Sequence, residues 1–504
     1  MDALKLEPQV FVRDRRTFEV RHFFDLPAAG NKAAWTVDYF LFFTRNIGIT
    51  PANWEIGDFY RSTQVLMRLQ SHGMSLQQLA DLSNIHNPGH MLMEQVPSLM
   101  TAKPAHGPSM TATAQLYGAE IADALQAEIV AIRSRLRDSP RIQARIDRLC
   151  AGTEAVLSAL TSLRRTVEPY RAVAHPELMP TLVFAEEYLM ALVDERFSEL
   201  ALSIAEEPFL VDGTGRALKL QLRLAETLRR LHEKRRSLGF VTPGRHAGEQ
   251  YGYRLSLLKK ELQKSLYLDM RASAKDPFVA NSAAMVAAGL AATWATIAQV
   301  PLLTGTLNSS RGVFFVALAV GAYVLKDRIK DLVKQRLLKQ WLKWDHNVSL
   351  ADHLFHLMGM SQVSGRAMEK AVWETIKSVP VDIVRLRRAA RTVRGSSTEL
   401  ENVLHYRRRV ELNGVETASF DAQFGIQEIV RISLSDVMAR LDDQIDVVAH
   451  WDEKSGSFMR SDLPKVYHLN LVYRVRQDGT NESFLRRARI VLNRKKILRI
   501  EHIG

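Results

Sequence analysis

The chain of 504 residues is 46% hydrophobic and 24% charged, which allows about two or three domains with cores of their own and argues against disorder. Its single cysteine, Cys150, excludes an intramolecular disulfide and suits a reducing compartment. The formal net charge of +13 indicates anionic partners, which could be lipid headgroups, acidic proteins or nucleic acid.

The amino-terminal region, residues 1–57, is predicted to contain a β-hairpin. Residues 18–24 and 35–43 are aromatic and β-branched, and residues 27–32 separate them with turn-forming side chains. An aromatic platform for nucleic-acid bases is the alternative, but it would need interleaved basic residues, and residues 35–43 have none. Packing in a core is therefore the favoured role.

Residues 58–276 are predicted to form a cytoplasmic helical region, because apolar residues recur there every three or four positions. The clearest stripe comprises Ile121, Leu125, Ile129, Ile132 and Leu136. A bundle or a long antiparallel hairpin would bury such stripes. An exposed seam that accepts a partner helix is the alternative.

The central segment, residues 277–325, is predicted to form a transmembrane helical hairpin. Residues 278–310 and 312–325 contain no charged side chain, and only Arg311 lies between them. A buried hairpin inside a large core is the alternative. Residues 1–8 lack the apolar core of a signal peptide, so the hairpin itself is expected to direct insertion.

Basic residues flank this segment on both sides, so the positive-inside rule places the amino- and carboxyl-terminal domains in the cytoplasm. Residues 326–394 are expected to form basic and amphipathic helices that contact the bilayer and its anionic lipid headgroups, with nucleic acid the less favoured partner. The candidate membrane-surface residues are Lys326, Arg328, Lys330, Lys334, Arg336, Lys339, Trp341, Lys343 and Trp344.

Small residues on the first helix of the hairpin are predicted to allow close helix packing, either on the second helix or on another subunit. The candidate packing residues are Ala284, Ala288, Ala291 and Ala292. A homo-oligomer is therefore a possible state of the protein.

Residues 395–504 are predicted to form a β-rich antiparallel domain, which the amino-terminal hairpin is expected to join. Short segments rich in β-forming residues alternate there with turns such as Asp478-Gly479. Residues 467–476 alternate between apolar and polar side chains, as in a sheet with one buried face. The predicted fold class is thus a membrane α+β protein.

Motifs of common enzymes are absent from the sequence: it contains no phosphate-binding loop, zinc helix, paired C-x-x-C or nucleophile elbow. We therefore assign no catalytic or cofactor-binding residue. His346, His353 and His356 are weak candidates for metal ligands on one helical face. Positions seven apart on a helix are separated by about 10 Å, too far for one ion, so no metal is assigned.

Several short motifs, taken in chain order, resemble a group of uncharacterised bacterial membrane proteins. They occupy residues 21–27, 38–43, 47–49, 59–60, 323–329 and 467–470. The resemblance implies a bacterial inner membrane and brings no activity with it.

The favoured function is a membrane-anchored scaffold or sensor that binds other proteins at the cytoplasmic face. An enzyme of unrecognised class, tethered to the membrane, is the alternative, since a catalytic cluster cannot be read from one sequence. An oligomerising effector that perturbs the membrane is the third class. It is the least favoured, because the predicted spans offer no polar pathway.

Overall fold

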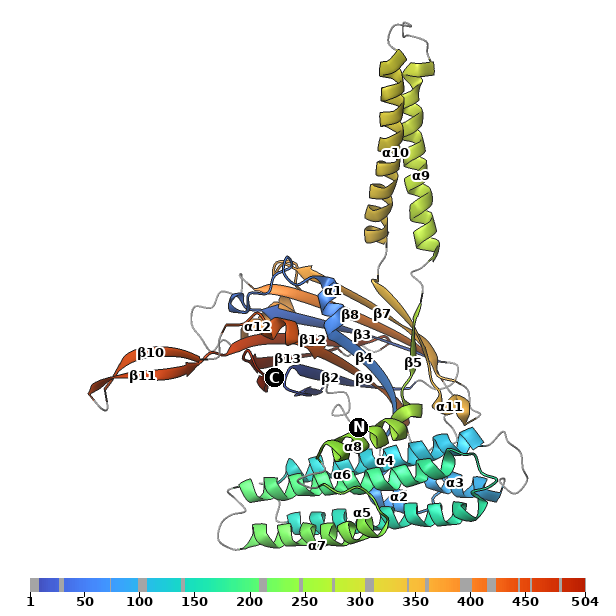
Figure 1. Ribbon diagram of the computed structural model, residues 1–504, viewed down its shortest axis with the longest axis vertical. Coiled ribbons are helices and arrows are strands. Elements are labelled where there is room, and N and C mark those ends of the chain that lie inside the picture. Colours follow the sequence, from blue (N-terminus) through green and yellow to red (C-terminus); the bar gives the residue numbers. More distant parts are fainter. Residues whose placement is uncertain are drawn as a thin grey trace.

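The computed structural model describes residues 9–26, 31–72, 74–97, 107–136, 141–207, 215–243, 248–273, 277–303, 312–341, 344–358, 362–389, 401–414, 423–442, 445–453, 456–479 and 483–503. In these residues the chain forms a helical bundle, two β-sheets with a shared core, a long helical hairpin and a separate two-stranded ribbon (Figure 1). The sheets lie between the bundle and the hairpin.

The larger sheet has eight strands in the described part of the chain, and all neighbouring strands are antiparallel. In spatial order they are β14 (Ile497–Ile503), β13 (Ser483–Leu492), β12 (Tyr467–Gln477), β3 (Lys32–Phe43), β8 (Asn402–Asn413), β7 (Ser364–Glu374), β6 (His346–Ala351) and β5 (Asp269–Ser273). The amino-terminal strand β3 is therefore inserted between two strands of the carboxyl-terminal region.

Within the described residues the smaller sheet has four strands, which pack their apolar face against the larger sheet. In spatial order they are β1 (Gln9–Val12), β2 (Thr17–Asp25), β9 (Gln423–Ser433) and β4 (Thr63–His72). Strands from both ends of the chain thus meet in this sheet as well.

The two amino-terminal strands are present, but the hairpin predicted between them is wrong. β2 pairs with β9, whereas β3 pairs with β8 and β12. Each strand has an apolar inner face, and these faces meet between the sheets, where Phe24 stacks on Trp35 with ring centroids 4.1 Å apart. Face-to-face packing therefore replaces the edge-to-edge pairing that their closeness in sequence suggested.

A bundle of long helices occupies most of the region predicted to be helical. They are α4 (Gly107–Arg133), α5 (Ile142–Val167), α6 (Leu178–Glu206), α7 (Arg216–Ser237) and α8 (Gly248–Gln263). α6 lies at the centre and packs against the other four. The predicted apolar stripe runs along α4 from Ile121 to Ile132 and continues to Leu136 in the turn that follows, and all its members are buried in the core of this bundle.

Short helices connect the larger elements. They are α1 (Ile56–Ser62), α2 (Leu76–Ala80), α3 (Pro88–Gln95), α11 (Leu354–Leu357), α12 (Val381–Ala389) and α13 (Ser435–Met438), with 3₁₀ turns at Arg45–Ile47, Glu168–Tyr170 and Lys264–Leu266.

Four of the described strands lie in regions that were predicted to be helical. β4 and β5 fall within residues 58–276, and β6 and β7 fall within residues 326–394. In β4, Val65, Met67 and Leu69 face the core between the sheets. These apolar residues occupy every second position, which is the pattern of a strand. The pattern covers only one short segment between helical ones, so the sequence did not reveal it.

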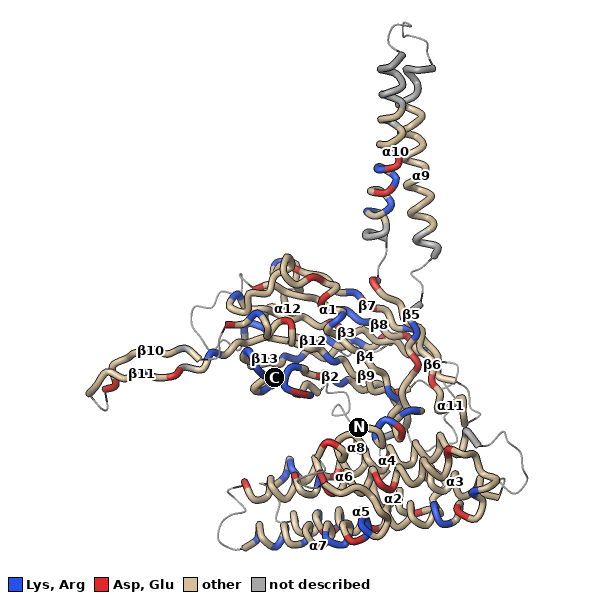
Figure 2. The backbone as a smooth tube through the Cα atoms, viewed as in Figure 1, with Lys and Arg blue, Asp and Glu red and all other residues tan. Residues whose placement is uncertain are grey.

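The hairpin consists of α9 (Pro277–Leu303) and α10 (Gly312–Trp341), which pack side by side and project away from the sheets (Figure 1). The prediction that it crosses a membrane is wrong, because no helix in the described residues is long and apolar enough to do so. α9 has polar residues, among them asparagine, threonine and glutamine, between its apolar ones. α10 becomes highly charged from Lys326 onward, as Figure 2 shows. The turn at residues 304–311 lies outside the described residues.

The membrane fold class is therefore corrected to α+β, with helices and large sheets in the described residues. The predicted location, an inner membrane crossed by two helices of the chain, is wrong for the same reason. The assignment of both terminal domains to the cytoplasm depended on those spans and falls with them.

The small residues of α9 form two different faces. Ala283, Ala287 and Ala291 are buried along the side that packs on α10. Of the candidate packing residues, only Ala291 belongs to this buried side. Ala284 is half-buried, and Ala288 and Ala292 are exposed. The contact between the helices thus uses a row of residues spaced four apart that lies one position before the row of Ala284, Ala288 and Ala292.

The ribbon formed by β10 (Ile445–Asp452) and β11 (Ser457–Pro464) extends beyond the sheets (Figure 1). Trp451 and Phe458 pack edge to face near its end, with centroids 5.0 Å apart, and both remain exposed. The ribbon therefore contributes little to the core.

A charged network lies in the apolar core between the two sheets. Arg408 of β8 is completely buried and forms ion pairs with Glu428 of β9 and Glu369 of β7. The indole N–H of Trp35 donates to Glu428 at 3.1 Å. Because a buried charge without a partner is strongly destabilising, these contacts hold the two sheets in one relative position.

We expect Arg408→Leu to lower the free energy of unfolding of the sheets by about 3–5 kcal/mol. The substitution leaves Glu428 and Glu369 buried without the cation that they share. The exposed Arg440 gives a matched control, because Arg440→Leu should change the free energy of unfolding by less than about 0.5 kcal/mol.

Tryptophan fluorescence during urea denaturation measures this effect. Trp35, Trp54 and Trp373 report on the sheets, and residues 74–263 contain no tryptophan, so the bundle contributes no tryptophan signal. Equal unfolding midpoints for the two arginine variants would contradict the structural role of the network.

The hairpin gives a second prediction. Ala287→Leu should push α9 away from α10 and destabilise the hairpin by about 1–3 kcal/mol, because the added methylenes have no room. Ala288→Leu makes the same change one position further on, at an exposed site, and should have little effect. Amide hydrogen exchange in α9 measures local opening. Equal exchange rates in the two variants would disprove the assigned packing face.

Candidate functional site

The outer face of the larger sheet, opposite the smaller sheet, carries a cluster of charged side chains on β8, β3 and β12. Two cross-strand rows form it: Arg407, Asp38 and Arg474, and beside them Arg409, Thr36 and Arg476. His405 of β8 lies next to the first row. We call these seven residues the arginine face. Because side chains alternate along a strand, the residues between them point into the core.

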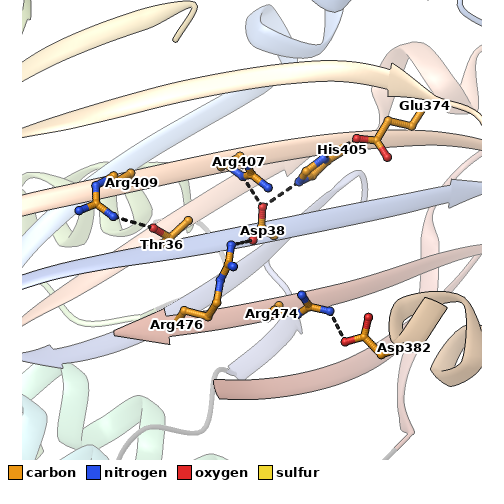
Figure 3. Close-up of polar contacts among 9 residues, drawn as sticks. All are labelled: Thr36, Asp38, Glu374, Asp382, His405, Arg407, Arg409, Arg474 and Arg476. Carbon is orange, nitrogen blue, oxygen red and sulfur yellow. Dashed lines mark hydrogen bonds and ion pairs between the residues drawn. The ribbon is translucent and has the colours of Figure 1, made fainter. Parts of the chain in front are cut away.

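Asp38 is the centre of the arginine face (Figure 3). Its Oδ1 accepts a hydrogen bond from Arg407 Nε at 2.6 Å and lies 2.8 Å from His405 Nε2. Its Oδ2 accepts a hydrogen bond from Arg476 at 2.6 Å. The other ring nitrogen of His405 lies 2.8 Å from Glu374. One buried carboxylate on β3 therefore binds side chains from both neighbouring strands, β8 and β12.

These contacts set the protonation states of Asp38 and His405. Burial alone would raise the pKa of Asp38, but hydrogen bonds from His405 and Arg407 hold it well below its usual range. Burial alone would lower the pKa of His405, but hydrogen bonds to Asp38 and Glu374 raise it above its ordinary value of 6.5. His405 is therefore stabilised as an imidazolium that donates both N–H groups to carboxylates.

Arg407 and Arg476 keep most of their hydrogen-bond donors available. A guanidinium is a fork of several N–H groups, and in the described residues each of these two uses one, toward Asp38. Their side chains are 42% and 45% exposed. Lys370, opposite Arg407 on β7, has no side-chain partner among the residues described. The three cations can bind an incoming carboxylate or phosphate group by charge-assisted hydrogen bonds.

The other two arginines are more fully paired. Arg409 donates to Asp478 at 2.6 Å and to Glu411 at 2.9 Å. Arg474 forms an ion pair with Asp382 of α12. Carboxylates are thus interspersed among the cations, and the available positive charge is concentrated at one side of the face.

α12 covers the neighbouring part of the outer face and leaves the arginines at its edge. Ile383 of α12 belongs to a small apolar core with Phe40 and Val472. Phe40 also stacks on the ring of His405, with centroids 4.2 Å apart. This packing buries His405 while Arg407 remains partly exposed.

The histidines considered as metal ligands do not lie on one helix. His346 begins β6, whereas His353 and His356 lie beyond the other end of that strand, at α11. The strand separates the first ring from the others by about 17 Å or more. All three are exposed. In the described part of the chain, no group of three or more His, Cys, Asp or Glu side chains could hold a metal ion.

The residues expected at a membrane surface lie mainly on the charged part of α10. Those on its described surface are Lys326, Arg328, Lys330, Lys334 and Arg336. Lys343 and the side chains of Lys339 and Trp341 lie outside the described residues, and Trp344 is half-buried. The lipid contact expected of this group depended on the membrane spans, so it loses that support.

Sequence analysis missed the arginine face, although part of its signal was present. His405, Arg407 and Arg409 occupy alternate positions, which is the pattern of a polar strand face. Their partner Asp38 could not be found in this way, because the pairing of β3 with β8 joins residues far apart in the sequence.

No family model, curated protein or solved structure matches this chain. The resemblance to bacterial membrane proteins therefore gains no support from the comparisons. The chemistry of the site itself is therefore the basis for a function.

The protonated His405 predicts a pH dependence of stability. A histidine whose pKa is raised in the folded state stabilises the fold fully below its ordinary value of 6.5 and loses this contribution as the pH rises through the folded-state value. The free energy of unfolding of the wild-type sheets should therefore fall from about pH 6.5 upward more steeply than that of His405→Asn. Urea denaturation followed by tryptophan fluorescence measures both. A difference that stays constant from about pH 6 to about pH 9 would contradict the assignment.

Proposed function

We propose that this protein is a non-catalytic scaffold or sensor that binds acidic segments of other proteins through its arginine face. The observation that carries the proposal is the geometry of Arg407 and Arg476, which are both held by Asp38 and still present free N–H donors at the surface. Side chains that are already oriented lose less conformational entropy when a partner binds.

The distribution of charge favours a protein partner over nucleic acid. Asp382, Glu411 and Asp478 lie among the arginines and would repel a continuous chain of phosphates. In the described residues of this face, Phe40 and Phe42 are buried, so they offer no ring for stacking with bases. Separate carboxylates on a peptide can instead reach the available cations and avoid the acidic positions.

A catalytic role is the second candidate, and the arginine face supports it less well. Both ring nitrogens of His405 are occupied by carboxylates, so the ring has no free position for proton transfer. The low pKa of Asp38 also makes this carboxylate a poor proton acceptor near neutral pH. Asp38 and His405 together therefore act as an anchor that orients the arginines.

The test is the binding of a fluorescent peptide of alternating glutamate and serine to the full-length protein. Arg407→Gln combined with Arg476→Gln should weaken binding about tenfold or more, because hydrogen bonds to charged groups contribute about 1.5–3 kcal/mol each. Fluorescence anisotropy measures the affinity, which should also fall as the salt concentration rises.

Two controls separate this surface from general charge attraction. Arg229→Gln combined with Arg236→Gln removes the same charge from exposed positions on α7 and should leave the affinity unchanged. A peptide with glutamine in place of glutamate should not bind. Equal weakening by the two double variants, or no binding of the acidic peptide to the wild-type protein, would refute the proposal.

A further inference from the structure

The helical bundle contains a pocket of about 590 Å³, bounded by α5, α6 and α7. This is within the usual size range of small-molecule sites. The bundle lies apart from the arginine face, which is on the outer side of the larger sheet (Figure 1). The pocket is therefore independent of the proposed partner-binding surface.

One wall of the pocket is apolar and its rim carries hydroxyl groups. Leu157, Val193 and Leu231 line the apolar part. Ser158 and Ser162 line the pocket from α5 and are exposed, so the pocket opens to solvent on this side. An apolar surface with a few polar groups nearby is the usual composition of a ligand site.

A buried ion pair lies at the polar wall. Glu186 of α6 is completely buried, and Lys234 of α7 approaches its Oε1 at 3.2 Å. Lys234 also donates a hydrogen bond to the hydroxyl of Thr161 at 2.7 Å, and Thr161 donates to Glu186 at 2.6 Å. Arg164 approaches the other oxygen of Glu186 at 3.0 Å. Two cations thus face one carboxylate, and Lys234 remains partly exposed to the pocket.

Besides Lys234, another cation is available at the same pocket. Arg165, one turn beyond Thr161 on α5, is exposed and has no side-chain partner in the described residues. It also lines a neighbouring pocket of about 330 Å³, whose wall includes Phe184. Arg230, which also lines the larger pocket, is instead paired with Glu154 at 3.6 Å. The cations that remain available to a ligand in this pocket are therefore Lys234 and Arg165.

The geometry points to a binding site for a small organic carboxylate, with its apolar body on Leu157, Val193 and Leu231 and its carboxylate between Lys234 and Arg165. A singly charged group fits better than a phosphate dianion, because Glu186 already takes part of the charge of Lys234. The hydroxyls of Ser158 and Ser162 can donate further hydrogen bonds to it.

Calorimetric titration of the full-length protein with decanoate tests this site, with decanol as the uncharged analogue. Decanoate should bind, and decanol should bind about tenfold more weakly or not at all. Lys234→Met should weaken the binding of decanoate about tenfold. Because this variant also disturbs the ion pair of Glu186, Ser158→Phe serves as the second test. It fills the pocket from an exposed position and should abolish binding.

Ala155→Phe is the matched control, since Ala155 is exposed on α5 but does not line the pocket. It should bind decanoate as the wild-type protein does. Failure of the wild-type protein to bind decanoate, or full binding by Ser158→Phe, would overturn the site. Equal affinity for decanol and decanoate would overturn the carboxylate assignment. The acidic-peptide measurement is unaffected by any of these outcomes.

Discussion

The insertion of β3 between β8 and β12 is the constraint on which both the core and the candidate site depend. One face of this strand buries Trp35 against the smaller sheet, where it also contacts the charged network around Arg408. The opposite face places Asp38 between the arginines of its two neighbours. Because strand side chains alternate, a shift in register by one residue would destroy both arrangements together.

Sequence patterns predicted the elements with strong local periodicity and failed where distant segments meet. The part of the stripe from Ile121 to Ile132 was readable because these residues lie on one helix, α4. The uncharged run of residues 278–310 suggested a membrane span, but its described part, residues 278–303, lies on an alanine-rich helix that packs on α10 through Ala283, Ala287 and Ala291. Composition alone does not show which face of a helix is covered.

The candidate site was even less accessible from sequence. The alternation of His405, Arg407 and Arg409 marked a polar strand face, but no local signal connects it with Asp38 or with Arg476. The raised pKa of His405 likewise exists only because folding brings two carboxylates to one ring. Such properties belong to the tertiary structure, and the chemistry of single residues does not contain them.

Hydrogen–deuterium exchange of the full-length protein, with and without a saturating acidic peptide, tests the partner-binding function most directly. We expect slower exchange in β8 and β12 and in the adjoining loops, with the bundle unchanged, because the proposed peptide contacts are made by Arg407 and Arg476 of these strands. Protection confined to the bundle or to α10 would contradict it, since the acidic partner would then bind to a different basic surface.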